Sequence, residues 1–350
     1  MPPMIETINL CKEYGELVAL NNLNLTIQEG DCFGFIGPNG AGKTTTIKIL
    51  ATLLKPTRGQ ASINGLTVGF QNRQIRPVIG YVPDFMGAYE DMVVTEYLEF
   101  FAAAYNIHGS KRHQVVKDVL DLTDLSYKAN AEVNSLSRGM QQRLSVARVL
   151  LHDPKVLLMD EPASGLDPRA RIEMRELLKE LKRMGKTIII SSHILRDLAE
   201  ICNVVGIIER GNLIFSGSVK EIMKRAKLEH TLLVVVAERT EEAANLLAAV
   251  PGVKKVTIGE EAAPAFAAMS NGTAGGGGGG LGAAAAGGGG GGGSTGRRPV
   301  IQLSFEESAL TQASDIPSRL VNAGFRLVRF TEEEVNLETA FMRLTQGLVQ

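Results

Sequence analysis

The stretch Gly37-Pro38-Asn39-Gly40-Ala41-Gly42-Lys43-Thr44 decides the fold of this chain. It fits the phosphate-binding pattern GxxxxGK[ST], in which glycines let backbone N–H groups turn inward around an anion. The apolar run Cys32–Ile36 before it predicts a buried strand, and residues 45–50 after it predict a helix. Strand, loop and helix in this order place a helix N-terminus against phosphate groups. We therefore expect Lys43 to reach the β- and γ-phosphates of a nucleotide and Thr44 to ligate Mg²⁺.

A second motif, Val156-Leu157-Leu158-Met159-Asp160-Glu161, predicts a buried strand that ends in two carboxylates. Open α/β sheets bind their ligands at this carboxyl edge of the strands. Two acids after a strand also fit N-caps of the following helix, but the nearby phosphate loop favours a catalytic pair. We expect Asp160 to hold Mg²⁺ through its water shell and Glu161 to act as general base on the attacking water.

The rest of the first two-thirds of the chain alternates short apolar strands with longer helical patterns, which is typical of a parallel α/β sheet. Further buried strands are predicted at residues 187–191 and 204–208. Residues 5–10 and 20–27 alternate in polarity and predict an antiparallel pair. Residues 92–151 read as a helical insert, with helices expected at 95–105 and 113–122.

The last third contains two β-α-β runs on either side of a tract made almost wholly of Gly and Ala, residues 274–296. The first run covers residues 231–236, 241–249 and 253–258, and the second covers 300–305, 316–322 and 325–330. Two such halves predict a small ferredoxin-like α+β domain. We expect domains at 1–225 and 226–350, a disordered loop at 270–298, and a final helix at about 337–344.

Between the two nucleotide motifs lies Asn134-Ser135-Leu136-Ser137-Arg138-Gly139-Met140-Gln141-Gln142-Arg143. After them come Ser164-Gly165-Leu166-Asp167-Pro168 and Ser191-Ser192-His193. In order and spacing this set resembles the ATPases of ABC transporters over about residues 4–222. In that family the first segment is the signature, usually spelled LSGGQ, and the LSRGM spelling here resembles some bacterial exporters.

The resemblance implies a P-loop NTPase core with a parallel sheet, an N-terminal antiparallel β subdomain and a helical subdomain that carries the signature. It implies ATP and Mg²⁺ as cofactors. The catalytic residues would be Glu161, His193 and Lys43, and the metal ligands Thr44, Asp84 and Asp160. The residues that would contact the nucleotide are Tyr14, Gly37, Pro38, Asn39, Gly40, Ala41, Gly42, Lys43, Thr44, Thr45, Asp84, Ser137, Arg138, Gly139 and Asp167.

The partners implied by the resemblance are a second copy of the subunit and a separate membrane-spanning permease. Ser137 opens a predicted helix whose free N–H groups would bind the γ-phosphate held by the other copy, and Asp167 would lie at the same seam. Residues 85–91, rich in aromatic and Met side chains, are either the docking surface for the permease or part of the core.

Three residues allow more than one interpretation. Tyr14 either stacks on adenine, as an aromatic ring does in such proteins, or is an ordinary core or edge tyrosine. Asp84 stands where the family usually has Gln, and its carboxylate can ligate Mg²⁺ but cannot donate a hydrogen bond to water. Arg138 replaces the usual glycine, and either adds a cation near the phosphates or points to solvent.

Composition excludes several other classes of protein. The 350 residues include 37 basic and 38 acidic side chains, for a net charge of −1, which argues against a nucleic-acid partner. No window approaches the roughly 20 apolar residues needed to cross a bilayer, and the first ten residues do not resemble a signal peptide. The cysteines Cys11, Cys32 and Cys202 fit buried thiols in a reducing compartment. We expect a peripheral protein at the cytoplasmic face of the cell membrane.

Two other functions fit parts of the sequence. A soluble ABC-type ATPase acting on nucleic acid or the ribosome would usually carry two cassettes or a coiled-coil insert and a basic surface. A binding module that does not hydrolyse ATP would be expected to lack some of the catalytic residues. The combination present here favours the transporter subunit, and export is implied by the resemblance alone.

Overall fold

The computed structural model describes residues 2–87, 92–192, 198, 200–222, 229–260, 299–306 and 314–332. The chain divides into two compact units, the first with Met1–Met223 and the second with Lys224–Val335. His193, residues 88–91, the Gly/Ala tract and the helix expected at 337–344 lie outside the described residues.

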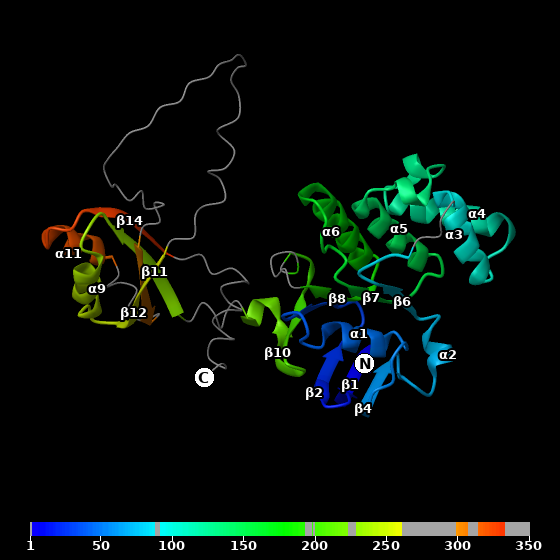
Figure 1. The fold of residues 1–350 in the computed structure, drawn as a ribbon, viewed down its shortest axis with the longest axis horizontal. Coiled ribbons are helices and arrows are strands. Elements are labelled where there is room, and N and C mark those ends of the chain that lie inside the picture. Colours follow the sequence, from blue (N-terminus) through cyan, green and yellow to red (C-terminus); the bar gives the residue numbers. More distant parts are fainter. Residues whose placement is uncertain are drawn as a thin grey trace, which may run out of the picture. The chain divides into compact units, whose positions relative to one another are not determined.

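The first unit is built on a sheet with strand order β10-β9-β3-β8-β7-β6, shown in Figure 1. Strands β9, β3, β8, β7 and β6 are parallel, and β10 pairs with β9 as an antiparallel edge. The central strands are mostly apolar and buried along their whole length, as expected for a sheet covered on both faces. Their bounds are β3 Cys32–Ile36, β6 Ile79–Val82, β7 Val156–Asp160, β8 Thr187–Ser192, β9 Val204–Glu209 and β10 Asn212–Ser218.

A second, antiparallel sheet forms the N-terminal part of this unit, with order β2-β1-β4-β5. Its strands are β1 Ile5–Tyr14, β2 Leu17–Ile27, β4 Arg58–Ile63 and β5 Leu66–Thr67. Helix α1, Lys43–Leu50, lies between this sheet and strands β7 and β8, and buries Ile47, Ile49 and Leu50 there (Figure 1). The core therefore surrounds the helix that follows the phosphate loop.

Helices gather at the other side of the parallel sheet, as predicted for the insert (Figure 1). They are α3 Val94–Ala104, α4 Gly109–Leu122, α5 Arg138–Leu150 and α6 Pro168–Arg183, with short 3-10 turns at Ser126–Lys128 and Val133–Ser135. The short helix α2, Asn72–Ile75, instead contacts β5 of the antiparallel sheet. A buried arginine ties the helices of the first group together: Arg143 on α5 donates to the Thr123 and Asp124 carbonyls and pairs with Glu173 on α6. The start of α5 is thereby fixed against both neighbours.

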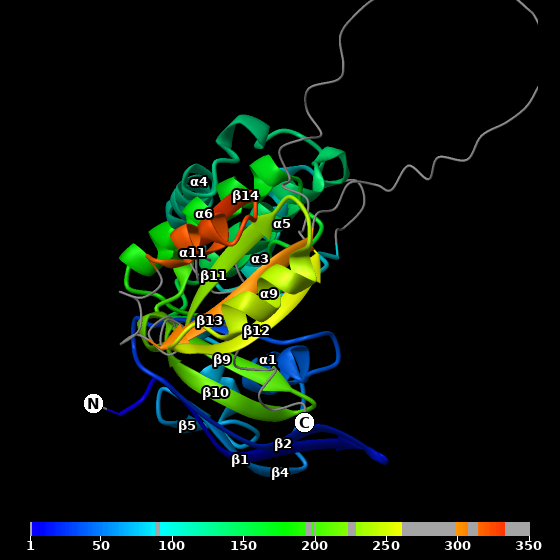
Figure 2. The ribbon, with the colours of Figure 1, turned by 90° about the vertical axis from the view of Figure 1, so that its left-hand side faces the viewer.

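The second unit has the strand order β12-β13-β11-β14, all antiparallel, which is the ferredoxin-like arrangement. Its elements are β11 Glu229–Val236, α9 Thr240–Ala248, β12 Val253–Glu260, β13 Pro299–Glu306, α11 Ile316–Asn322 and β14 Leu327–Glu332. Both helices pack on one face of the sheet through buried aliphatic side chains (Figure 2). Glu260 pairs with Pro299, so the strands on either side of the Gly/Ala tract are neighbours.

The structure corrects some predicted boundaries. Residues 79–82, for which no strand was predicted, form the edge strand β6. Strand β14 begins at Leu327 instead of residue 325, because the buried Phe325 still belongs to the turn after α11. The three cysteines are buried and free, as predicted, with the Cys32 and Cys202 sulfurs 3.6 Å apart.

Candidate nucleotide site at the carboxyl edge of the parallel sheet

The phosphate loop joins β3 to α1, and two of its glycines are required by their surroundings. Gly42 has φ 110°, which side chains rarely adopt, and it caps the start of α1. Gly37 passes so close to the next strand that a Cβ would lie 2.2 Å from the Ile208 carbonyl oxygen. The loop can therefore be built only with glycine at these positions, and its N–H groups are left to face an anion at the helix N-terminus.

Lys43 is folded back into this loop. Its Nζ donates to the carbonyl oxygens of Gly37 at 2.6 Å and Pro38 at 3.2 Å, and lies 3.5 Å from Oε1 of Glu161. The ammonium group is buried, so its charge acts with little screening by water. It is placed to meet an anion that enters the loop.

Asp160 ends β7 beside the first turn of α1. Its Oδ1 accepts hydrogen bonds from the hydroxyls of Thr44 at 3.0 Å and Ser191 at 2.7 Å. The role of Ser191 as the residue that orients Asp160 was missed from the sequence, although it belongs to the Ser191-Ser192-His193 segment. Its contact depends on the neighbouring strand β8, which no local pattern specifies.

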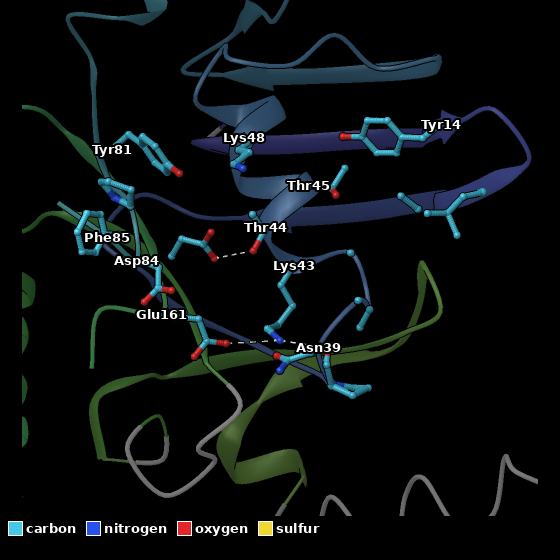
Figure 3. A pocket seen from close by; sticks show the side chains of 18 residues that line it. Tyr14, Asn39, Lys43, Thr44, Thr45, Lys48, Tyr81, Asp84, Phe85 and Glu161 are labelled. Carbon is cyan, nitrogen blue, oxygen red and sulfur yellow. Dashed lines mark hydrogen bonds and ion pairs between the residues drawn. The ribbon is translucent and has the colours of Figure 1, made fainter. Parts of the chain in front are cut away.

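Glu161 has an unusual backbone. Its φ is 50°, and its N–H donates to the Ser191 hydroxyl at 2.9 Å and to the Ser191 carbonyl at 3.2 Å. A left-handed conformation at a non-glycine residue costs energy and is found preferentially at functional sites. Here the turn directs the Glu161 carboxylate toward Lys43 (Figure 3).

These residues line one cavity of about 590 Å³. Figure 3 shows Tyr14 on the opposite side of the phosphate loop from Tyr81, Asp84 and Phe85. Sequence reasoning missed several lining residues; of these, Lys48 follows Thr44 by one helical turn, a spacing that could have identified it. The lining residues are Tyr14, Leu17, Ala19, Pro38, Asn39, Gly40, Ala41, Gly42, Lys43, Thr44, Thr45, Lys48, Tyr81, Pro83, Asp84, Phe85, Asp160 and Glu161.

Tyr14 stands at the end of β1 and is 46% exposed, with Lys12 Nζ 4.9 Å from its ring centre. It is therefore an edge residue with an accessible ring, placed where a flat aromatic base can reach it. At the other side, burial, which is the largest cause, and the negative charges of Asp160 and Asp84 together raise the pKa of Tyr81 to about 12. Both carboxylates thus act electrostatically on the same part of the cavity.

The oxygen donors in this cavity fit Mg²⁺. Thr44, Asp160 and Asp84 offer one hydroxyl and two carboxylates, the hard oxygen ligands that this ion prefers, and Mg²⁺ keeps several waters when it binds a nucleotide. Thr44 and Asp160 already lie within hydrogen-bond distance of each other. These residues could hold the ion beside the phosphate loop.

The signature residues lie elsewhere. Ser137, Arg138, Gly139 and Asp167 do not line the cavity of their own chain. Ser137 is exposed and caps α5, its Oγ accepting from Met140 N–H at 3.4 Å. Asp167 is also exposed and caps α6 through the N–H groups of Arg169 and Ala170. Both helix N-termini therefore face solvent.

Gly139 has a packing reason to be glycine. It is buried where α5 meets α6, and a Cβ at this position would lie 2.5 Å from the Cβ of Ala170. The close contact of the two helices, rather than backbone strain, excludes a side chain here.

Comparison with known proteins identifies the family. Residues 20–164 match the ABC transporter family. The chain is 41% identical over 214 residues to the Nod factor export ATP-binding protein I of Burkholderia lata, a match that covers 61% of this chain and 70% of that protein. This chain belongs to the ATP-binding proteins of ABC transporters. An uncharacterized ABC transporter ATP-binding protein of Nostoc sp. is 37% identical, with 65% and 70% covered.

Solved structures agree with this assignment. The ABC ATP-binding protein described here has a TM-score of 0.58 to an ATP-binding subunit of an ABC transporter, with 29% identity, 64% of this chain and 94% of the other covered. It has a TM-score of 0.56 to the cassette MJ0796, solved as a dimer in a post-hydrolysis state with ADP and Pi, at 28% identity and 62% and 99% coverage.

The predicted fold class and family are thus confirmed, and the chain is an ATP-binding and ATP-hydrolysing subunit of a transporter. Across the described residues, none of the helices has both the length and the apolar character needed to span a membrane. Among the similar structures, MJ0796 is a dimer and cbiO1 of Clostridium perfringens is part of an ABC transporter complex.

Proposed function

We propose that two copies of this subunit clamp two ATP molecules between the phosphate loop of one copy and the Ser137 end of α5 in the other. The observation that carries the proposal is that Ser137 is exposed at a helix N-terminus outside its own cavity. Such an end has free N–H groups and a partial positive charge that suit a phosphate. The similar cassette MJ0796 was solved as a dimer bound to ADP and Pi, which supports a nucleotide-bound dimer of this subunit.

Within each site, the backbone of residues 37–45 and the Lys43 ammonium would bind the phosphates, while Tyr14 would contact the base. Glu161, turned toward Lys43 by its backbone, would take a proton from the attacking water. A bound Mg²⁺, held by Thr44, Asp160 and Asp84, would neutralise charge on the phosphates. Asp167 and His193 would complete the seam, and His193 lies outside the described residues.

We further propose that the dimer drives export through a separate membrane permease, at the cytoplasmic face of the membrane. The support is the similarity to Nod factor export proteins and the LSRGM signature. Phe85 lines the cavity, is 79% exposed and would be part of the permease-docking surface. Residues 88–91 of that predicted surface lie outside the described residues, and no nucleic-acid partner is proposed.

Purification from detergent-solubilised membranes of its own cell tests the partner. We expect a multispanning membrane protein to copurify with the chain. The Phe85→Glu variant should lose this partner, and the Phe70→Glu variant should retain it. Phe70 is a control for the new surface charge because it is 90% exposed. Since Phe85 lines the cavity and Phe70 does not, the Phe85→Glu variant must also be shown to bind ATP as the wild type does. If the chain instead sedimented with ribosomes, the proposed permease partner would be wrong. That result would favour a soluble ABC-type ATPase.

A further inference from the structure

Asp84 and Arg138 are the two positions at which this chain departs from the usual family residues, and the structure brings them together. Arg138 Nη2 lies 3.9 Å from Asp84 Oδ1. Asp84 follows β6, whereas Arg138 is the first residue of α5. The two departures therefore form one contact between the segment after β6 and the signature helix.

The two ends of this contact belong to different nucleotide sites of the proposed dimer. Asp84 lines the cavity of its own chain, close enough for its charge to act on Tyr81. Arg138 directly follows Ser137, which is exposed outside that cavity. A contact within one chain thus joins its own nucleotide site to the helix end offered to a second copy.

Neighbouring contacts hold the pair in register. One turn after Arg138, the buried Gln142 donates from Nε2 to the Pro83 carbonyl oxygen at 3.3 Å. Pro83 precedes Asp84, so this bond fixes the carboxylate relative to the start of α5. Two consecutive turns of α5 therefore contact two consecutive residues of the segment after β6.

The guanidinium of Arg138 also fits against a glycine. A Cβ on Gly165 would lie 2.5 Å from Arg138 Nη1, so the guanidinium lies directly against this glycine, whose φ of 65° disfavours a side chain. Gly165 precedes the α6 N-cap Asp167. Arg138 thus lies between the segment after β6 and the loop before α6, with its side chain 57% exposed.

We propose that the Asp84–Arg138 pair couples the two nucleotide sites: it balances the Asp84 charge beside its own ATP and makes the position of the Ser137 helix end depend on that site's occupancy. The inference rests on the proposed dimer. Asp84 would be drawn from Arg138 toward a cation held by Thr44 and Asp160 when nucleotide binds. The two residues act as positioning residues, since neither needs to take part in bond cleavage.

The first test measures ATP binding without metal, in EDTA, at protein concentrations where the chain is monomeric. Displacement of a fluorescent ATP analogue should show binding about two- to fivefold weaker in Arg138→Gln, because an exposed pair contributes at this scale. The reason is that the positive charge of Arg138 no longer offsets the Asp84 carboxylate beside the triphosphate. In an Asp84→Asn background, Arg138→Gln should have no effect.

Arg183→Gln is the matched control, since it removes the same charge from an exposed position at the far end of α6. It should leave binding unchanged in both backgrounds. Equal weakening by Arg138→Gln in both backgrounds would mean that Arg138 acts on nucleotide without Asp84. If Arg138→Gln weakened binding in neither background, the Asp84–Arg138 pair would have no influence on nucleotide binding. Either result overturns the proposal.

A second test separates this inference from the dimer on which it rests. Coupling predicts that Arg138→Gln and Asp84→Asn each lower the Hill coefficient of ATP hydrolysis toward 1, while Arg138→Lys keeps most of the wild-type value. An unchanged Hill coefficient in variants that still form the ATP-bound dimer overturns the coupling alone. Failure of the Glu161→Gln variant to dimerise with ATP overturns the proposed function.

Discussion

Lys43 Nζ and Glu161 Oε1 lie 3.5 Å apart inside the cavity, with side-chain exposures of 5% and 14%. The ammonium group of the phosphate loop is thus paired with the carboxylate that would serve as general base. A triphosphate that enters the loop supplies its own negative charge to Lys43. Loss of Lys43 should therefore affect ATP binding, and loss of Glu161 should affect ATP hydrolysis.

Glu161→Gln should retain ATP binding while turnover falls by about 10²-fold or more, because the amide keeps the shape of the side chain but accepts no proton. Because the bound ATP is then not hydrolysed, the variant should accumulate as a stable dimer when ATP is present. Single-turnover hydrolysis and size-exclusion chromatography with ATP measure the two effects. Hydrolysis at the wild-type rate would remove Glu161 from the role of base.

Lys43→Ala should weaken ATP binding itself, by roughly 10- to 100-fold, since charged hydrogen bonds contribute about 1.5–3 kcal/mol. Equilibrium titration with a fluorescent ATP analogue measures the loss. Lys55→Ala is a suitable control because Lys55 is exposed and does not line the cavity. If Lys43→Ala bound ATP as tightly as this control, the loop would not be the phosphate site.

Gly139→Ala should destabilise the first unit by about 1–3 kcal/mol, because the added methyl group meets Ala170 across the α5–α6 contact. The clash exceeds the gain in helix propensity, which is at most about 1 kcal/mol. Urea unfolding of the full chain, followed through the transition of the first unit, measures the change.

The double variant Gly139→Ala/Ala170→Gly tests whether the cause is this contact. Removing the opposing methyl group should restore much of the lost stability. A Gly139→Ala variant as stable as wild type would show that the helices separate without cost, and glycine would then need a reason other than packing.

His152 predicts a pH dependence of stability. Its Nε2 lies 2.9 Å from the Ile79 carbonyl oxygen and its ring stacks on Tyr105, and burial lowers its pKa below the usual 6.5. The unfolded chain therefore takes up this proton at a higher pH than the folded chain does. Stability should fall as the pH drops from above 6.5 toward the lowered pKa of the folded state.

His152→Gln should flatten this part of the pH profile, because its amide donates to Ile79 without titrating. Urea unfolding of both proteins at pH 7.5, 6.5 and 5.5 gives the free energy of unfolding at each pH. This free energy should change less with pH in the variant than in the wild type. Parallel profiles for the two proteins would show that His152 does not protonate on unfolding in this range.

Much of the fold was predictable because its signals are local. The strand before the phosphate loop, the loop itself and the start of α1 follow from glycine spacing and an apolar run, and β3 has the predicted bounds Cys32–Ile36. Helix α11 likewise matches residues 316–322, with Pro near its start and Gly just after its end. The ferredoxin-like order follows from two β-α-β runs, since few topologies close such a sheet.

The site was predictable only as far as it lies on those elements. Lys43, Thr44, Asp160 and Glu161 come together because parallel strands end at one edge, a rule that sequence order is enough to apply. The remaining side of the cavity comes from the antiparallel sheet, where Leu17 and Ala19 sit. Their polarity pattern indicates a strand but not which cavity the strand borders.

By itself, then, the sequence determined the phosphate loop, the acidic strand end and the class of both units, because backbone conformation and burial period are properties of adjacent residues. Only the tertiary structure decided that Arg138 contacts Asp84, that Gly139 meets Ala170 and that Ser191 holds Asp160. Each of these contacts joins elements far apart in the chain. Their distances are set by how helices and strands pack together, which no local pattern specifies.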